Sequence, residues 1–138
     1  MKSRVTSILS IGIALVAVAA VQAQDKTVTA NVPFSFYLGS SAMPQGAYRV
    51  GELSHGAVVW IRSTNAAKAA TTHEIAGKKE IEPARLVFHR YGDSYFLAEI
   101  WTGDTSFGKA LAASPREKEL AQNGAAPALA VIRLALHQ

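Results

Sequence analysis

The sequence predicts a mainly β protein, a single-domain antiparallel β-sandwich or small barrel with one short helix in its C-terminal half. Short apolar stretches recur between turn residues along residues 24–138, which is the spacing of an all-β sandwich or barrel. Two β-rich runs flank Gly92-Asp93, a pair suited to a tight hairpin turn. One helix start, Ser114-Pro115-Arg116-Glu117, stands out in the second half. Residues 24–138 have the size of one ordinary domain.

The first 23 residues predict an export signal. Lys2 and Arg4 form a basic start, residues 5–21 are mostly apolar, and Val21-Gln22-Ala23 is a small-x-small site of the kind that signal peptidase accepts. Cleavage between Ala23 and Gln24 would give a periplasmic or secreted bacterial product. An uncleaved anchor is the alternative, but polar residues dilute the apolar run, so we expect no stable membrane insertion after cleavage.

Composition narrows the possible partners and chemistry. Without Lys2 and Arg4 the chain has twelve basic and ten acidic residues, and the basic ones form no stripe that could follow a phosphate backbone. Nucleic acid is therefore not an expected partner. The chain has no cysteine, which excludes disulfides and thiolate chemistry.

The first half of the domain predicts five short strands and a loop. The strands cover residues 27–32, 34–38, 48–50, 58–61 and 66–72. In the first of them Val28, Ala30 and Val32 share one face. Residues 58–61 are continuously apolar, which predicts a central strand buried on both faces. The charged residues 77–83 predict a solvated loop.

The hairpin around Gly92-Asp93 is the strongest local signal. A turn at this pair places three residue pairs opposite each other: His89 and Phe96, Phe88 and Leu97, Arg90 and Tyr95. One face would carry Val87, His89, Tyr91, Phe96, Ala98 and Ile100, and the other Leu86, Phe88, Arg90, Tyr95, Leu97, Glu99 and Trp101. Both faces are rich in apolar groups, so the hairpin either lies in the middle of the fold or leaves one face exposed to a partner.

A helix and a last strand complete the predicted fold. Ser114 caps a helix that runs to Gln122, with Glu117 reaching back as in a capping box, and the helix stops at Asn123-Gly124. Residues 128–136 predict a closing strand with four apolar side chains on one face: Ala130, Ile132, Leu134 and Leu136. A helix over the same residues is the alternative.

Two motifs carry a resemblance to known proteins. They are Val32-Pro33-Phe34-x-Phe36 followed by Met43-Pro44-x-Gly46-x-Tyr48-Arg49-Val50, and the hairpin sequence 86–93. With these motifs the chain resembles a group of small exported β-rich proteins from soil bacteria. The resemblance covers most of residues 24–138 and implies a small exported β fold, without implying an activity. The turn at Pro44 also resembles turns in prealbumin-type β-sandwich modules.

Catalytic and metal sites are not expected. The histidines, His55, His73, His89 and His137, lack the paired spacing of a zinc site. A catalytic triad of Ser94, His89 and Asp93 is not expected, because a hairpin turn already explains the serine and the aspartate. Glu80 and Glu82 fit a solvated loop better than a carboxylate pair. We expect no catalytic residue, cofactor or metal ligand. A carboxylate such as Glu99 within hydrogen-bonding reach of His89 would instead indicate an enzyme.

The hairpin supplies the candidate residues for partner contact: Arg90, Tyr91, Tyr95 and Trp101. Aromatic faces stack on sugars or cations, so an exposed cluster of this kind would bind a ligand. The favoured alternative is that the rings fill a β core while Arg90 extends to its edge.

The sequence thus predicts an exported, non-enzymatic β module that binds a macromolecule, a protein or glycan of the envelope or outside the cell, through a sheet face or edge. The alternative is a small lipocalin-like barrel carrying an apolar ligand in an interior lined by Phe34, Phe36, Val59, Phe88 and Leu97. A binder should have an exposed apolar patch, whereas a carrier should have an enclosed cavity. No oligomeric state is predicted.

Overall fold

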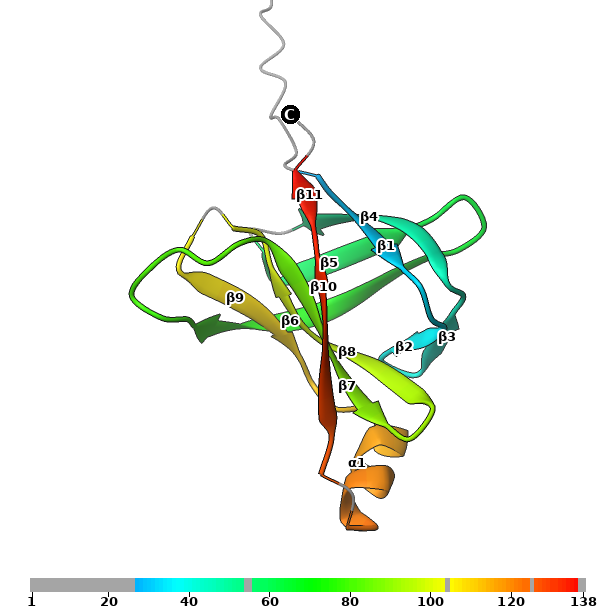
Figure 1. The fold of residues 1–138 in the computed structure, drawn as a ribbon. Coiled ribbons are helices and arrows are strands. Elements are labelled where there is room, and N and C mark those ends of the chain that lie inside the picture. Colours follow the sequence, from blue (N-terminus) through cyan, green and yellow to red (C-terminus); the bar gives the residue numbers. More distant parts are fainter. Residues whose placement is uncertain (1–26, 54–55, 104, 125, 137–138) are drawn as a thin grey trace, which may run out of the picture.

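The computed structural model describes residues 27–53, 56–103, 105–124 and 126–136 (Figure 1). They form eleven strands and the helix α1 (Pro115–Gln122). The strands are β1 (Val28–Val32), β2 (Phe36–Leu38), β3 (Ser41–Met43), β4 (Gly46–Leu53), β5 (Val58–Arg62), β6 (Ala67–Ala76), β7 (Arg85–Tyr91), β8 (Ser94–Trp101), β9 (Phe107–Leu111), β10 (Ala128–Arg133) and β11 (Ala135–Leu136). The expected cleavage site between Ala23 and Gln24 lies outside the described residues.

The strands form one open, mostly antiparallel sheet around a single core. Their order along the main path is β10-β7-β8-β9-β6-β5-β4-β1-β11. β2 joins this path from the side, through a parallel pair with β8 and an antiparallel pair with β3. In Figure 1 the strands β4 and β5 run across the direction of β10, so the sheet is strongly bent. The prediction of a mainly β fold with one short helix is confirmed.

The small-barrel alternative is wrong, because the sheet is not closed. The end strands β10 and β11 are successive segments of the chain, and Leu134 separates them by donating its backbone amide to the Ala84 carbonyl at 2.9 Å. β10 pairs with β7 and β11 pairs with β1. β6 pairs with β5 through residues 67–71 and with β9 through residues 72–76. The two halves of the predicted sandwich are therefore joined through β6 into one continuous sheet.

The core is built from alternate residues of the strands. Its largest fully buried side chains are Tyr48, Phe36, Phe88, Ile61, Leu86, Ile100, Val32, Val50 and Val59. The predicted inward face of β1 is confirmed, since Val28, Ala30 and Val32 are all buried. Burying these apolar surfaces is the main favourable contribution to folding.

The expectation that residues 58–61 are buried on both faces is wrong. Val59 and Ile61 are buried in the core, but Val58 and Trp60 are only half-buried. No second layer covers them among the described residues; the Trp60 ring instead lies against Gly51, where a Cβ atom would be 2.2 Å from the ring. The neighbouring prediction of a strand over 66–72 is confirmed, and β6 continues to Ala76.

The hairpin prediction is confirmed at the turn and corrected further along the strands. His89 faces Phe96, Phe88 faces Leu97 and Arg90 faces Tyr95, as expected. The register then shifts between Val87 and Phe88, so that Val87 faces Glu99 and Ala98 is left as the extra residue of a bulge. Beyond this point the predicted faces are reversed: Ile100 lies in the core, and Glu99 and Trp101 share the side of Val87.

Both faces of the hairpin carry buried side chains. β7 lies between β10 and β8, and β8 lies between β7 and β9. Five buried side chains of the hairpin lie outside the core cluster: Val87, Tyr91, Phe96, Ala98 and Trp101. They belong to the side of β10, β7 and β8 that points away from the core, which we call the outer face. Helix α1 covers one end of it.

Helix α1 has the predicted bounds. The Ser114 hydroxyl accepts a hydrogen bond from the Glu117 amide at 3.2 Å, Pro115 is the first helical residue, and Gly124 follows the helix with φ +87°. The expectation that the Glu117 side chain completes a capping box is wrong. Its carboxylate hydrogen-bonds His89 and Tyr91 on the outer face instead.

The strand predicted over 128–136 is confirmed, with a break at Leu134. Ala130, Ile132 and Leu134 pack against the core, as the predicted face requires. This arrangement excludes the helical alternative for these residues.

Candidate functional site: the free edge of β10

β10 is an edge strand with apolar side chains on both faces. Among the described strands it pairs only with β7, through six residue pairs from Ala128 with Arg90 to Arg133 with Arg85. Ala130 and Ile132 point to the core, whereas Leu129 and Val131 lie on the outer face and are 67% and 52% exposed. β1 also approaches β10, but in the described part of the chain no strand pairs with the second row of backbone donors and acceptors on β10.

The free edge of β10 lacks the features that usually prevent strands from pairing. Natural edge strands carry charges, prolines or bulges that discourage a further strand. From Ala128 to Ile132 there is no charge and no proline; Pro127 precedes this stretch and Arg133 follows it. The ladder between β10 and β7 is also regular, with one partner for each residue. The edge is therefore suited to accept another extended segment.

The outer face next to this edge is apolar in the middle and basic at one end. Leu129 and Val131 of β10 lie opposite His89 and Val87 of β7, and Arg133 lies opposite Arg85. Residues directly opposite in an antiparallel pair share a face. Leu129, Val131 and Val87 therefore form a short apolar strip beside the free edge.

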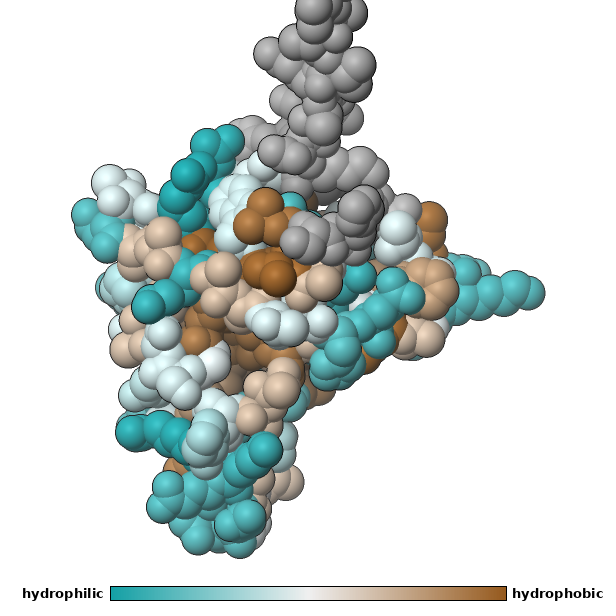
Figure 2. All heavy atoms as spheres, turned by 180° about the vertical axis from the view of Figure 1, so that it is seen from behind, coloured by the Kyte–Doolittle hydropathy of each residue, from teal (hydrophilic) through white to brown (hydrophobic). Residues whose placement is uncertain are grey.

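Other exposed apolar residues are scattered. Leu53, Ile81 and Phe107 lie on three different segments of the chain. Figure 2 shows the side opposite to that of Figure 1, where apolar side chains form small separate areas among hydrophilic ones. Single exposed apolar residues are ordinary on protein surfaces. The pair on β10 differs because both residues adjoin a free sheet edge.

Helix α1 is held on the outer face by a buried carboxylate. The side chain of Glu117 is only 7% exposed and its Oε1 lies 2.7 Å from His89 Nδ1. The Tyr91 hydroxyl donates to the same oxygen at 3.4 Å. Because a buried carboxylate without partners is costly, these contacts fix the helix over β7.

A carboxylate does lie within hydrogen-bonding reach of His89, the arrangement that would indicate an enzyme, but it belongs to a different residue from the one expected. The carboxylate beside His89 is Glu117, 28 positions away in the sequence, and not Glu99. Glu99 instead accepts a hydrogen bond from Trp101 Nε1 at 2.8 Å. A carboxylate that binds one imidazole nitrogen orients the ring, which serves catalysis only where a nucleophile or substrate adjoins the other nitrogen. The cross-strand neighbours of His89 are Leu129 and Phe96, which supply no such group.

Burial raises the pKa of Tyr91, and the nearby Glu117 carboxylate raises it further. A group with a raised pKa in the folded state stabilises that state fully below its unfolded pKa of about 10, and this contribution is lost as pH rises through the folded pKa. We therefore expect a late phase in the alkaline absorbance titration of tyrosine, and Tyr91→Phe should make it smaller. A late phase of unchanged amplitude in Tyr91→Phe would contradict this assignment. Tyr48, whose pKa is also raised by burial, should account for the remainder.

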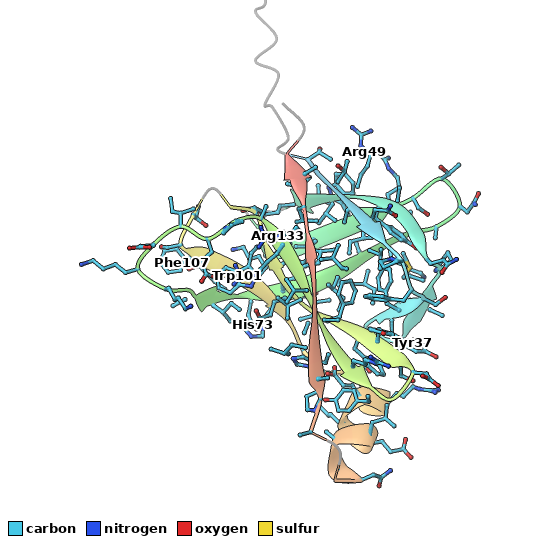
Figure 3. The ribbon with its side chains drawn as sticks, viewed as in Figure 1. Tyr37, Arg49, His73, Trp101, Phe107 and Arg133 are labelled. Carbon is cyan, nitrogen blue, oxygen red and sulfur yellow. The ribbon has the colours of Figure 1, made fainter. Side chains whose placement is uncertain are left out.

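The four predicted contact residues do not form one cluster. Arg90 and Tyr95 do lie together, with the guanidinium carbon 5.5 Å from the ring centroid. Tyr91 is buried on the outer face, on the other side of the sheet from this pair. Trp101 is buried at the far end of β8, where Arg85 lies over its ring at 4.7 Å. Figure 3 places it near β9, far from the end of the sheet marked by Tyr37.

Two groups of residues in the site were not among the predicted contacts. Leu129 and Val131 lie in a strand that was predicted, but only the alternate residues were assigned a role. Residues 128–132 are apolar at every position, and this was the available signal that both faces of the strand are apolar. Glu117 was assigned to helix capping, and nothing in the local sequence points to its contact with β7.

The described residues contain no group of three or more His, Cys, Asp or Glu side chains that could hold a metal ion. Within this part of the chain, no helix is long and apolar enough to cross a membrane.

Comparisons of the chain with protein-family models, with curated proteins and with solved structures gave no match. The resemblance to exported proteins of soil bacteria stays a prediction from the two sequence motifs.

Proposed function

We propose that this chain is an exported, non-enzymatic β module that binds a protein of the cell envelope or the extracellular space by adding a strand of that protein to β10. The observation that carries the proposal is the free edge of β10, with Leu129 and Val131 exposed beside it. In strand addition, main-chain hydrogen bonds supply affinity and alternate side chains supply specificity. An exported protein meets its partner in the compartment that residues 1–23 predict.

The chemistry of the outer face defines the partner segment. Leu129, Val131 and Val87 favour apolar side chains at alternate positions of the added strand. Arg133 is exposed at one end of β10, and β10 itself contains no acidic residue. A carboxylate at the matching end of the partner segment would be favoured by this charge. The expected partner is thus an extended apolar segment with an acidic residue at one end.

Two observations support a binder over the alternatives. The residues that would line a carrier's interior pack against one another, with Phe36 and Phe88 ring centroids 5.3 Å apart and Phe34 and Phe88 centroids 5.0 Å apart. Close-packed rings leave the interior of the sheet filled. The His89 and Glu117 pair holds α1 on the sheet, a structural role that needs no substrate.

The test uses charges placed at the free edge. We expect the double variant Leu129→Lys/Val131→Lys to fold, because both side chains are exposed, and to lose partner capture by about tenfold or more, because lysines on an edge strand oppose pairing. The tagged full chain is expressed in its native host and crosslinked in the exported fraction. The partner is then identified and quantified by mass spectrometry, and its crosslinked peptide is mapped.

Phe107→Lys is the matched control, since Phe107 is also an exposed apolar residue of a strand but lies on β9, away from the free edge. Capture should be retained in this control, and all variants should melt at similar temperatures. Equal capture by the double variant and the parent chain, or crosslinks that map away from residues 128–133, would contradict the proposal.

A further inference from the structure

A groove of about 440 Å³ lies at the end of the sheet where the hairpin of β2 and β3 meets the turn between β7 and β8. This volume is in the range of small-molecule sites. Tyr37, which lines it, is labelled in Figure 3. The groove is separate from the free edge of β10: β8 and β7 lie between them in the strand order.

Five polar side chains line the groove: Ser35, Tyr37, Asp93, Ser94 and Tyr95. They offer four hydroxyls and one carboxylate, and none of these groups has a hydrogen bond or ion pair with another described residue. Hydroxyls can donate and accept, whereas an ionised carboxylate only accepts. The described lining residues include no lysine, arginine or histidine.

The Tyr95 ring on the groove wall has two partners. The Phe34 ring stacks on Tyr95 with centroids 3.8 Å apart and planes 13° apart, and the Arg90 guanidinium lies over the ring at 5.5 Å. Arg90 also donates from Nε to the Gly92 carbonyl at 2.8 Å, which ties this stack to the turn that carries Asp93. Preorganised polar groups lose little freedom when a ligand binds.

Tyr37, which lies opposite Phe96 and so on the outer face, is held in a similar way. Its ring stacks on Phe96 with centroids 5.1 Å apart, and the Arg116 guanidinium of α1 lies over it at 5.3 Å. Both tyrosine rings therefore already have partners over their faces, so they can offer a ligand mainly their edges and hydroxyls. This favours a ligand recognised by hydrogen bonds over one recognised by stacking.

The remaining lining includes Ala42 and Pro44, which are apolar and exposed, and Phe36 and Met43, which are buried in the core. The groove thus combines an apolar surface with hydroxyls and one carboxylate. A sugar has matching properties, because its C–H groups pack on apolar surface while its hydroxyls donate to a carboxylate and exchange hydrogen bonds with other hydroxyls. The Asp93 carboxylate, the charged group in the described lining, disfavours an anionic ligand beside it.

We infer that this groove is a binding site for a neutral saccharide, recognised by Asp93 and the hydroxyls of Ser94, Tyr37 and Tyr95. The site is independent of strand addition at β10. A chain with both sites could hold a glycan and an extended protein segment at the same time.

The test is a titration of the full mature chain with cellotriose, maltotriose and triacetylchitotriose, followed by amide chemical shifts in NMR. We expect at least one of these sugars to shift the amides of residues 35–44 and 93–95. Asp93→Asn, which preserves a turn-forming residue, and Tyr95→Phe, which preserves the stacked ring, should each weaken that binding by about tenfold.

Two matched controls remove the same groups elsewhere: Glu80→Gln in the exposed loop 77–83 and Tyr91→Phe on the outer face. Both should bind like the parent chain, and so should Leu129→Lys/Val131→Lys, which separates this inference from the β10 proposal. The absence of shifts at these amides with all of the sugars would overturn the inference, and shifts caused by benzylamine instead would indicate a cationic ligand. Sugar binding that Asp93→Asn and Tyr95→Phe leave unchanged would also overturn it.

Discussion

Phe88→Ala should lower the free energy of unfolding by about 3–5 kcal/mol, the range observed when a buried phenylalanine is truncated. Phe88 is fully buried, and its ring contacts Phe34 and Phe36 edge to face. Truncation removes both contacts and leaves a cavity between β2 and the hairpin. Since domains are stable by only about 5–15 kcal/mol, the variant should be partly unfolded or close to it. Urea denaturation followed by circular dichroism measures the change.

Phe107→Ala provides the comparison, because the Phe107 side chain is 48% exposed. Its effect should be a small fraction of the effect at Phe88. Similar losses at the two positions would mean that the ring cluster around Phe88 is not the centre of the core.

Glu117→Ala should have the second largest effect, a loss of about 1–3 kcal/mol, the cost of leaving hydrogen-bonding groups without a partner. The variant removes the carboxylate that accepts from His89 and Tyr91 and so detaches α1 from β7. Because the His89 side chain is 32% exposed, solvent weakens its contact with Glu117 and reduces the loss of stability. Denaturation by urea at neutral pH measures it.

Glu119→Ala is the matched control on the same helix, because Glu119 is exposed. It should change stability little. If the two glutamates gave equal effects, the contact between Glu117 and β7 would not be what holds the helix, and helix propensity would explain both results.

Local sequence signals predicted the turns and caps of this fold well. The pair Gly92-Asp93 fixes a two-residue turn, and the turn alone fixes the register of the residues beside it, from Tyr91 with Ser94 to Phe88 with Leu97. Ser114 and Pro115 fix the start of α1 in the same way. These features depend on a few neighbouring residues, so no tertiary information is needed.

The bulge at Ala98 shows where such prediction ends. No glycine or proline marks it, and the register shift appears only in the pairing of β7 with β8. A shift of one residue reverses every later face, which is why Ile100 and Trp101 were assigned to the wrong sides. The same limit applies to Trp60, whose partial burial depends on where β4 places Gly51.

The candidate site was predictable only in part, because it depends on the order of strands in the sheet. Strand order depends on the whole chain, so the sequence of β10 alone does not predict that this strand lies at an edge of the sheet. Aromatic composition suggested a binding cluster on the hairpin, yet Tyr91 and Trp101 are buried and Tyr95 is stacked on Phe34. The alternative that aromatic rings fill buried positions describes Tyr91 and Trp101 better.

Hydrogen–deuterium exchange of the β10 amides tests the central claim most directly. The parent chain is compared with and without a synthetic peptide corresponding to the partner segment mapped by crosslinking. Because N–H groups alternate in direction along an antiparallel strand, strand addition should slow exchange at alternate residues of 128–133, those whose amides point away from β7. Unchanged exchange throughout β10 at saturating peptide, or protection confined to another strand, would contradict binding at this edge.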